Sequence, residues 1–222
     1  MTHSSPPLCA YCGSQPGITR DHPVPRGLFT RPLPALMVTV PACLGCNAVK
    51  AGDETYLRDA LVLQGACERH PVARALIQGP ILRASRTNRS EFLRAARRDA
   101  RAVPLQTPTG LYAGQGVAVP LDWGRVAAAV ERTVRGLYFQ LRGDRFPDGY
   151  RFEVWHRDTV DGLQVWEGMR LHGANGPYTL GDGVFSCRMM VAEEDPGITL
   201  WLLWFYGTYA IEVDTRPADG ER

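Results

Sequence analysis

Cys43-Leu44-Gly45-Cys46-Asn47 (residues 43–47) repeats a cysteine spacing found earlier in the chain, in Cys9-Ala10-Tyr11-Cys12 (residues 9–12). Each Cys-x-x-Cys motif places two thiolates on one tight turn, and two such motifs complete the tetrahedral coordination that zinc prefers. We therefore expect one structural zinc ion, bound by Cys9, Cys12, Cys43 and Cys46. Because the protein supplies all four ligands, no position is left for a substrate, and we expect no direct catalytic role for this zinc.

The zinc ion is expected to hold the N-terminal region in its folded form. Thirty residues lie between Cys12 and Cys43, and the ion closes this loop at both ends. Structural zinc in small peptides contributes about 10–16 kcal/mol of apparent binding free energy at neutral pH, which is large beside a net domain stability of about 5–15 kcal/mol. The remaining cysteines, Cys67 and Cys187, lie outside both motifs, and we expect buried thiols at both positions.

The composition is typical of a globular protein. The chain has 222 residues, 45% of them apolar, which is enough for one sizeable core or two small ones. Residues 1–7 contain no apolar run, so we expect no secretory signal and a cytoplasmic location. The most apolar window, residues 198–213, contains Gly207 and Glu212, and we interpret it as a buried β-segment and not as a membrane span.

Charge is distributed unevenly along the chain, although the net charge is only +2. Residues 83–101 contain seven arginines against two acidic residues, whereas residues 144–222 contain fourteen acidic and seven basic residues. The middle segment is therefore the expected electrostatic contact for a polyanion. A solvated helix face neutralised by the acidic C-terminal half is an equally good interpretation of the same arginines.

The apolar pattern predicts an α+β protein in three parts: residues 1–64 with the cysteine motifs, residues 65–122 as a helical arginine-rich connecting segment, and residues 123–222 as an α+β domain. In the first part we expect a strand at residues 36–40 and a helix that begins at the second cysteine motif, breaks near Gly52 and continues to Leu63. In the second part we expect a helix at residues 91–102, followed by a connecting loop marked by Pro104, Pro108 and Gly110.

The C-terminal part changes from a helical to a strand period. Apolar residues recur every three to four positions over residues 123–141, which predicts an amphipathic helix. Four strands are then expected, with a turn at residues 195–197 between the last two, at residues 151–155, 165–171, 184–191 and 198–205. This part is expected to be a helix packed on an antiparallel sheet, with the aromatic residues of the last strand buried.

A group of polar residues suited to metal and proton chemistry lies inside the cysteine-clamped loop. Thr19-Arg20-Asp21-His22-Pro23-Val24-Pro25 contains an acidic residue followed by histidine, and Asn47 follows the last cysteine directly. Asp21 and Asn47 offer hard oxygen ligands of the kind that Mg²⁺ prefers, and His22 can act as a general base near neutral pH. Phosphodiester hydrolysis needs such a base together with positive charge at the phosphate.

The first Cys-x-x-Cys motif is followed by Asp21-His22, and the second is followed directly by Asn47. This order resembles the zinc-clamped branch of the HNH, or ββα-metal, endonucleases, over about the first quarter of the chain. The resemblance implies that residues 1–64 form a ββα-metal nuclease module. It further implies that His22 is the general base, that Asp21 and Asn47 hold one Mg²⁺ or Mn²⁺ ion, and that the enzyme cleaves nucleic acid, with DNA the expected target, leaving a 5′-phosphate. Chains of this plan commonly serve in defence or genome processing.

The sequence departs from the family pattern at two positions. A middle asparagine often fixes the hairpin loop, but residues 35–42 contain none, and Thr39 is the candidate substitute. Asn47 stands where many members have histidine, which implies a weakly held hard cation, with Asp53 or Glu54 as an additional ligand. A regular strand would also send Asp21 and His22 to opposite faces, so we expect the prolines that follow to bend the backbone there.

Nucleic-acid contacts are expected at the basic residues near the site and in the middle segment, namely Arg20, Arg26, Lys50, Arg94, Arg97 and Arg98. Two other functions stay open at this stage: a zinc knuckle that binds nucleic acid or protein without cutting, and a C-terminal domain that carries the main activity itself. The C-terminal domain is also where a homo-oligomeric or regulatory partner would bind. No membrane partner is expected.

Overall fold

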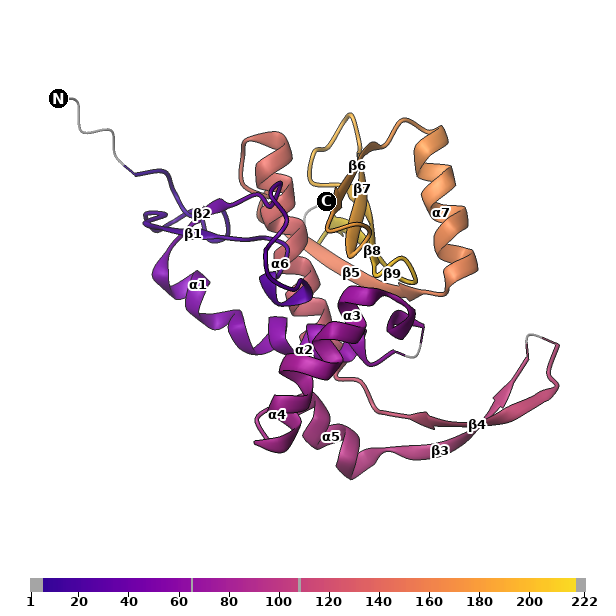
Figure 1. Cartoon of the computed structure of the whole chain (residues 1–222). Helices are drawn as coiled ribbons and strands as arrows, with labels where there is room; N and C mark the ends of the chain where they lie inside the picture. The colour runs from indigo at the N-terminus through magenta and orange to yellow at the C-terminus, as the bar shows by residue number, and fades with distance from the viewer. Residues whose placement is uncertain (1–5, 65, 108, 219–222) are drawn as a thin grey trace.

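The computed structural model describes residues 6–64, 66–107 and 109–218. It has an α+β architecture with a two-stranded β1–β2 pair, a protruding β3–β4 hairpin and one five-stranded antiparallel sheet (Figure 1). The α+β class predicted from the sequence is therefore confirmed. No helix of the described residues is long and apolar enough to cross a membrane.

The N-terminal part is a ββα unit. Strands β1 (Thr19–Asp21) and β2 (Val40–Ala42) pair antiparallel, and they are followed by helices α1 (Leu44–Val49) and α2 (Ala51–Val62). The strand expected at residues 36–40 is wrong in position, because pairing with β1 begins only at Val40. The helix with a break is confirmed, although the break falls at Lys50 and not at Gly52.

The middle part contains short helices and an arm. A 3₁₀ turn (Cys67–Arg69) precedes α3 (Pro71–Leu76), and a π-helical turn (Ile77–Ile81) leads into α4 (Leu82–Arg86). Helix α5 (Glu91–Asp99) follows, and Ser90 caps its N-terminus. The loop expected after α5 is wrong: β3 (Arg101–Gln106) and β4 (Tyr112–Ala118) form a hairpin that projects from the molecule (Figure 1). Pro104 lies within β3, where an unpaired edge tolerates the missing N–H, and Pro108 lies outside the described residues.

The C-terminal part consists of α6 (Trp123–Arg142), α7 (Thr159–Leu171) and the sheet, in the order β5-β9-β8-β7-β6. Its strands are β5 (Tyr150–Arg157), β6 (Asn175–Leu180), β7 (Phe185–Val191), β8 (Thr199–Phe205) and β9 (Tyr209–Pro217). The predicted helix over residues 123–141 is confirmed. The strand predicted at residues 165–171 is wrong, because these residues end α7, and a short apolar run does not distinguish a strand from a helix.

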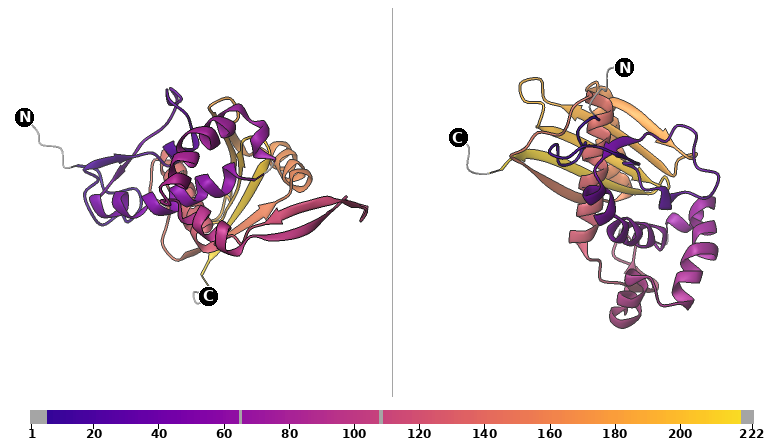
Figure 2. Two further views of the ribbon diagram at one scale, coloured as in Figure 1. Left: turned by 60° about the horizontal axis from the view of Figure 1, so that its bottom comes forward. Right: turned by 90° about the vertical axis from the view of Figure 1, so that its left-hand side faces the viewer.

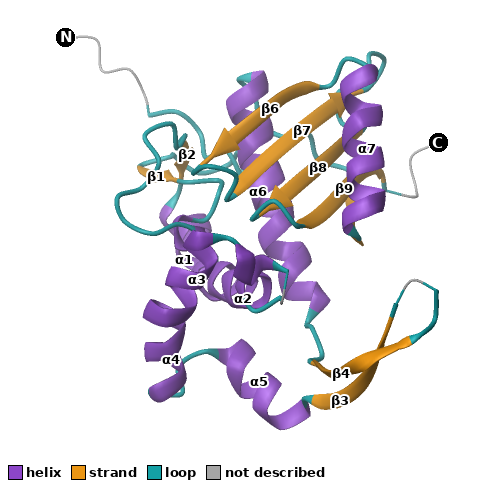
Figure 3. Ribbon diagram, turned by 45° about the vertical axis from the view of Figure 1, so that its right-hand side comes forward, coloured by secondary structure: helices purple, strands orange, loops and turns teal. Residues whose placement is uncertain are grey.

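The sheet lies between α6 and α7, as Figure 3 shows. Alternation along β8 sends Trp201, Leu203 and Phe205 into the main core with α6, while Leu202 and Trp204 pack with Met169 of α7. These residues are at most 7% exposed. The predicted buried aromatic strand is therefore confirmed.

Helix α6 also packs against the ββα unit (Figure 2). Thr133 donates to the carbonyl of Pro23 at 3.0 Å, and Val24 and Leu28 belong to the same apolar core as α6. A Cβ atom at Gly136 would lie 2.7 Å from Cβ of Pro23, so glycine allows this close approach. The residues after β1 are thus held against the C-terminal part.

Candidate metal centre and catalytic site

Cys9, Cys12, Cys43 and Cys46 cluster with all their Sγ atoms within 4.8 Å of one another. The geometry follows from the fold: Cys43 stands at the N-cap of α1, where its Sγ accepts a hydrogen bond from the Cys46 amide at 3.3 Å. Four thiols converging in this way suit zinc. The cluster predicted from the cysteine spacing is confirmed, as are the buried free thiols of Cys67 and Cys187.

The metal-free thiols differ in acidity. Hydrogen bonds from Ser14 lower the pKa of Cys12 to about 6, whereas burial, followed by hydrogen bonding with Cys43, raises the pKa of Cys46 to about 12. Zinc binds thiolates, so loading the site releases the proton of Cys46. Zinc affinity should therefore fall on acidification.

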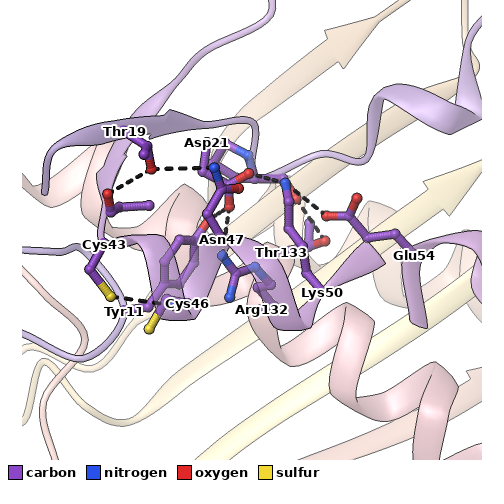
Figure 4. Close-up of polar contacts among 12 residues, drawn as sticks. Tyr11, Thr19, Asp21, Cys43, Cys46, Asn47, Lys50, Glu54, Arg132 and Thr133 are labelled. Carbon is purple, nitrogen blue, oxygen red and sulfur yellow. Dashed lines mark hydrogen bonds and ion pairs between the residues drawn. The ribbon is translucent and has the colours of Figure 1, made fainter. Parts of the chain in front are cut away.

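Asp21 is the last residue of β1, and it is 1% exposed. Its Oδ2 accepts hydrogen bonds from the Tyr11 hydroxyl at 2.7 Å and from Arg132 Nη2 at 2.8 Å, and its Oδ1 accepts from the ammonium of Lys50 (Figure 4). Burial alone would raise the pKa of this carboxyl, but the hydrogen bonds from Lys50, Tyr11 and Arg132 outweigh burial and lower it. Asp21 is therefore ionised at neutral pH.

His22 follows directly after β1, where the backbone has left the strand. Its Nδ1 lies 3.2 Å from the carbonyl oxygen of Val38. A carbonyl only accepts, so Nδ1 carries the proton of the neutral ring and the lone pair is on Nε2. Burial, followed by the charge of Arg26, lowers the pKa of His22, so the ring is neutral and basic at neutral pH.

The Val38 carbonyl thus fixes the imidazole, and residues 35–42 contain no asparagine. Thr39, the candidate substitute, instead accepts a hydrogen bond from Arg20 at 3.1 Å. Asn47 Nδ2 donates to Thr19 Oγ1 at 3.3 Å. Thr19 and Asp21 are two residues apart on β1 and share one face of the strand, so Asn47 lies on the Asp21 side of β1.

Asp21 and Asn47 offer the carboxylate and amide oxygens that suit Mg²⁺ or Mn²⁺, but Lys50 contacts the Oδ1 atom that a cation would need. A cation at this site must therefore displace the ammonium. Glu54 is aimed at the same place, with Oε1 3.2 Å from Lys50 Nζ. Asp53 points elsewhere, because its Oδ1 is held by Arg125 of α6 at 2.8 Å.

The basic residues proposed to contact nucleic acid fall into two groups. Lys50 reaches Asp21, Arg26 lies close enough to lower the pKa of His22, and Arg20 is on the exposed side of β1. The others lie on α5, which packs against α2 (Figure 3), and they make local contacts: Arg94 to the carbonyl of Asn88, Arg97 to Ser85 and Arg98 to Asp99.

Two residues at the site were not anticipated from the sequence. Tyr11 lies between Cys9 and Cys12, and that position is a signal that its side chain is near the cysteine cluster. Arg132 lies 111 residues after Asp21, and no spacing in the sequence connects them. No protein-family model, curated protein or solved structure matches this chain.

Proposed function

We propose that this protein is a zinc-stabilised, Mg²⁺- or Mn²⁺-dependent endonuclease of the HNH type that hydrolyses DNA phosphodiester bonds. The observation that supports the proposal best is His22, whose Nδ1–H donates to Val38 and leaves Nε2 free as a base. An ionised carboxylate, Asp21, precedes it directly, and Asn47 stands on the same side of β1. A half-buried base that directly follows a buried carboxylate is an arrangement typical of a catalytic site.

In this proposal His22 Nε2 removes a proton from the attacking water, and the Val38 carbonyl keeps the ring in the required tautomer. Asp21 and Asn47 would hold the divalent cation, which would supply positive charge at the scissile phosphate and the leaving oxygen. Lys50 leaves Asp21 for Glu54 and can then contact a backbone phosphate. Arg20 and Arg26 flank the site and would position the nucleic acid without reading its sequence.

The proposal is tested by incubating the zinc-loaded protein with supercoiled plasmid and Mg²⁺ or Mn²⁺. His22→Ala should lower the cleavage rate by about 10²–10⁴-fold, the usual contribution of a general base. His172→Ala is the matched control, because this histidine is exposed at the end of α7, and it should cleave normally. EDTA should stop cleavage and excess Mg²⁺ should restore it, which separates the catalytic cation from the zinc.

One observation favours a second function. The ammonium of Lys50 already neutralises Asp21 Oδ1, so the site is also compatible with a zinc knuckle that binds nucleic acid or protein without cutting. A wild-type protein that binds plasmid and RNA but cleaves neither, with either cation and at every salt concentration, would favour this binding module over the nuclease.

A further inference from the structure

The two carboxylate oxygens of Asp21 have different surroundings. Oδ2 is contacted by Tyr11 and by Arg132, whereas Oδ1 is contacted by Lys50. Tyr11 comes from the zinc knuckle, Arg132 from the middle of α6 and Lys50 from the junction of α1 and α2 (Figure 4). Three separate segments therefore meet at one side chain.

The contacts on Oδ2 are held rigidly. The Arg132 guanidinium lies over the Tyr11 ring, with Cζ 3.7 Å from the ring centre, and its side chain is only 17% exposed. Tyr11 is 8% exposed, and its position between Cys9 and Cys12 ties it to the zinc site. Its hydroxyl donates to Asp21 Oδ2 at 2.7 Å.

The contact on Oδ1 is easier to exchange. Lys50 has a second carboxylate, Glu54, 3.2 Å from its ammonium, so it keeps a partner when it leaves Asp21. Its flexible four-carbon stem permits this movement, unlike the stacked planar group of Arg132. Oδ1 is therefore the oxygen that an incoming cation can take over.

Arg132 is also a costly residue at this position. Its Nε is buried and makes no hydrogen bond within the described part of the chain, and an unsatisfied buried donor destabilises the folded state. A buried ion pair is often no more stabilising than apolar residues of similar volume. Buried charged residues that lower the stability of the fold are expected at functional sites.

We infer that Tyr11 and Arg132 are positioning residues for the catalytic cation: together they fix Asp21 Oδ2 and direct Oδ1 at the metal. The inference rests on the proposed nuclease function. It makes the zinc knuckle and α6 parts of the catalytic machinery, since each supplies one contact to the same oxygen. Supporting contacts of this kind typically change metal affinity or activity by about 10–100-fold when they are removed.

The test uses two substitutions that conserve charge, Tyr11→Phe and Arg132→Lys, in the full-length zinc-loaded protein. Mn²⁺ binding is measured by electron paramagnetic resonance without nucleic acid, and plasmid cleavage is measured separately at saturating Mn²⁺. Each variant should bind Mn²⁺ roughly tenfold more weakly or cleave roughly tenfold more slowly. Zinc content and the melting temperature show whether each variant is folded, and Tyr11→Phe removes only one hydroxyl.

Two further variants control for charge and for position. Arg135→Lys changes an arginine one turn further along α6, which stacks on Phe152 and pairs with Glu131, and it should behave as wild type. Lys50→Met removes the competing ammonium, so it should bind Mn²⁺ several-fold more tightly, following the Coulomb term between neighbouring charges. A network that only stabilised the fold would not make Mn²⁺ binding tighter when the contact to Oδ1 is removed and weaker when a contact to Oδ2 is changed.

The outcomes separate the inference from the function on which it rests. If Mn²⁺ binds wild type and Asp21→Asn equally, the proposed cation site is wrong and the positioning role falls with it. If Asp21→Asn loses Mn²⁺ but Tyr11→Phe and Arg132→Lys bind and cleave as wild type, only the positioning role is overturned. Weaker binding or slower cleavage in both variants, with Arg135→Lys unaffected, supports it.

Discussion

In the ββα unit each strand is three residues long and pairs only with the other, whereas the strands of the C-terminal sheet have six to nine residues and are covered by a helix on each face. The apolar cluster around the proposed zinc site has six buried residues, two of them cysteines. Two short strands are not stable alone, and four converging thiols suit a metal ion that would compensate for this small core. We expect the C-terminal sheet, which is covered on both faces, to fold without the metal.

Removing zinc should produce the largest difference in stability between the ββα unit and the C-terminal sheet. Cys43→Ser should abolish zinc binding and cleavage and unfold the ββα unit, because structural zinc contributes about 10–16 kcal/mol. All five tryptophans lie between residues 123 and 204, so tryptophan fluorescence should change little while proteolysis at residues 13–42 becomes fast. Cys67→Ser, at a buried thiol outside the zinc site, is the control. Equal loss of both signals would show that the sheet also depends on the metal.

The reverse experiment weakens the sheet. Trp201 is fully buried, and its indole N–H donates to Thr199 at 2.8 Å. Trp201→Ala should lower the free energy of unfolding by about 3–5 kcal/mol, the usual cost of such a cavity, and urea unfolding measures it. Zinc content should stay at one ion per chain. Loss of zinc in the folded variant would show that the zinc site depends on the packing of the sheet.

A smaller effect is expected where α5 joins α2. Ser90 donates to the buried Asp59 at 2.6 Å and accepts the first amide bond of α5 from Leu93. Ser90→Ala should cost about 1–3 kcal/mol, because it leaves a buried carboxylate oxygen without its donor. Hydrogen exchange should increase mainly in α5. Thr87→Ala, at an exposed hydroxyl nearby, should change little, and an equal increase in β8 would contradict a local role.

The cleavage rate should also depend on pH, with a midpoint set by the pKa of His22. Burial lowers the pKa of His22 below its ordinary value of about 6.5, and only the neutral ring can accept a proton. The cleavage rate should therefore rise about tenfold per pH unit on the acid side and level off with a midpoint below 6.5. Zinc content must be checked at each pH, because acid also releases the metal. A midpoint well above 6.5 would argue against His22 as the base.

The smallest effect is expected from the arginines of α5. If Arg94 contacts phosphate, Arg94→Gln should reduce the slope of log affinity against log salt by about one, measured by fluorescence anisotropy with a DNA duplex. Arg170→Gln is the control, since Arg170 is an exposed arginine paired with Glu167 on α7. An unchanged slope for Arg94→Gln would identify α5 as a solvated surface.

Local sequence was sufficient for some elements and not for others. The period of α6 and the cysteine spacing are local patterns with a direct structural meaning, and both predictions are confirmed. The β3–β4 arm and α7 were predicted wrongly, because Pro104 and Gly110 suggested a loop and residues 165–171 are as apolar as a strand. Whether such a segment forms a loop, a strand or a helix depends on its pairing partner and on the surface against which it packs. Neither can be inferred from the sequence of the segment alone.

The sequence by itself determined the four-cysteine cluster and the order of the proposed catalytic residues, because cysteine spacing and residue chemistry are properties of short segments. Only the tertiary structure placed Val38 against His22 and brought Arg132 and Tyr11 to Asp21. These contacts depend on how α6 packs against the ββα unit, and that packing is decided by the shape and burial of side chains distant in the sequence. The environment of Asp21 is therefore a property of the whole fold.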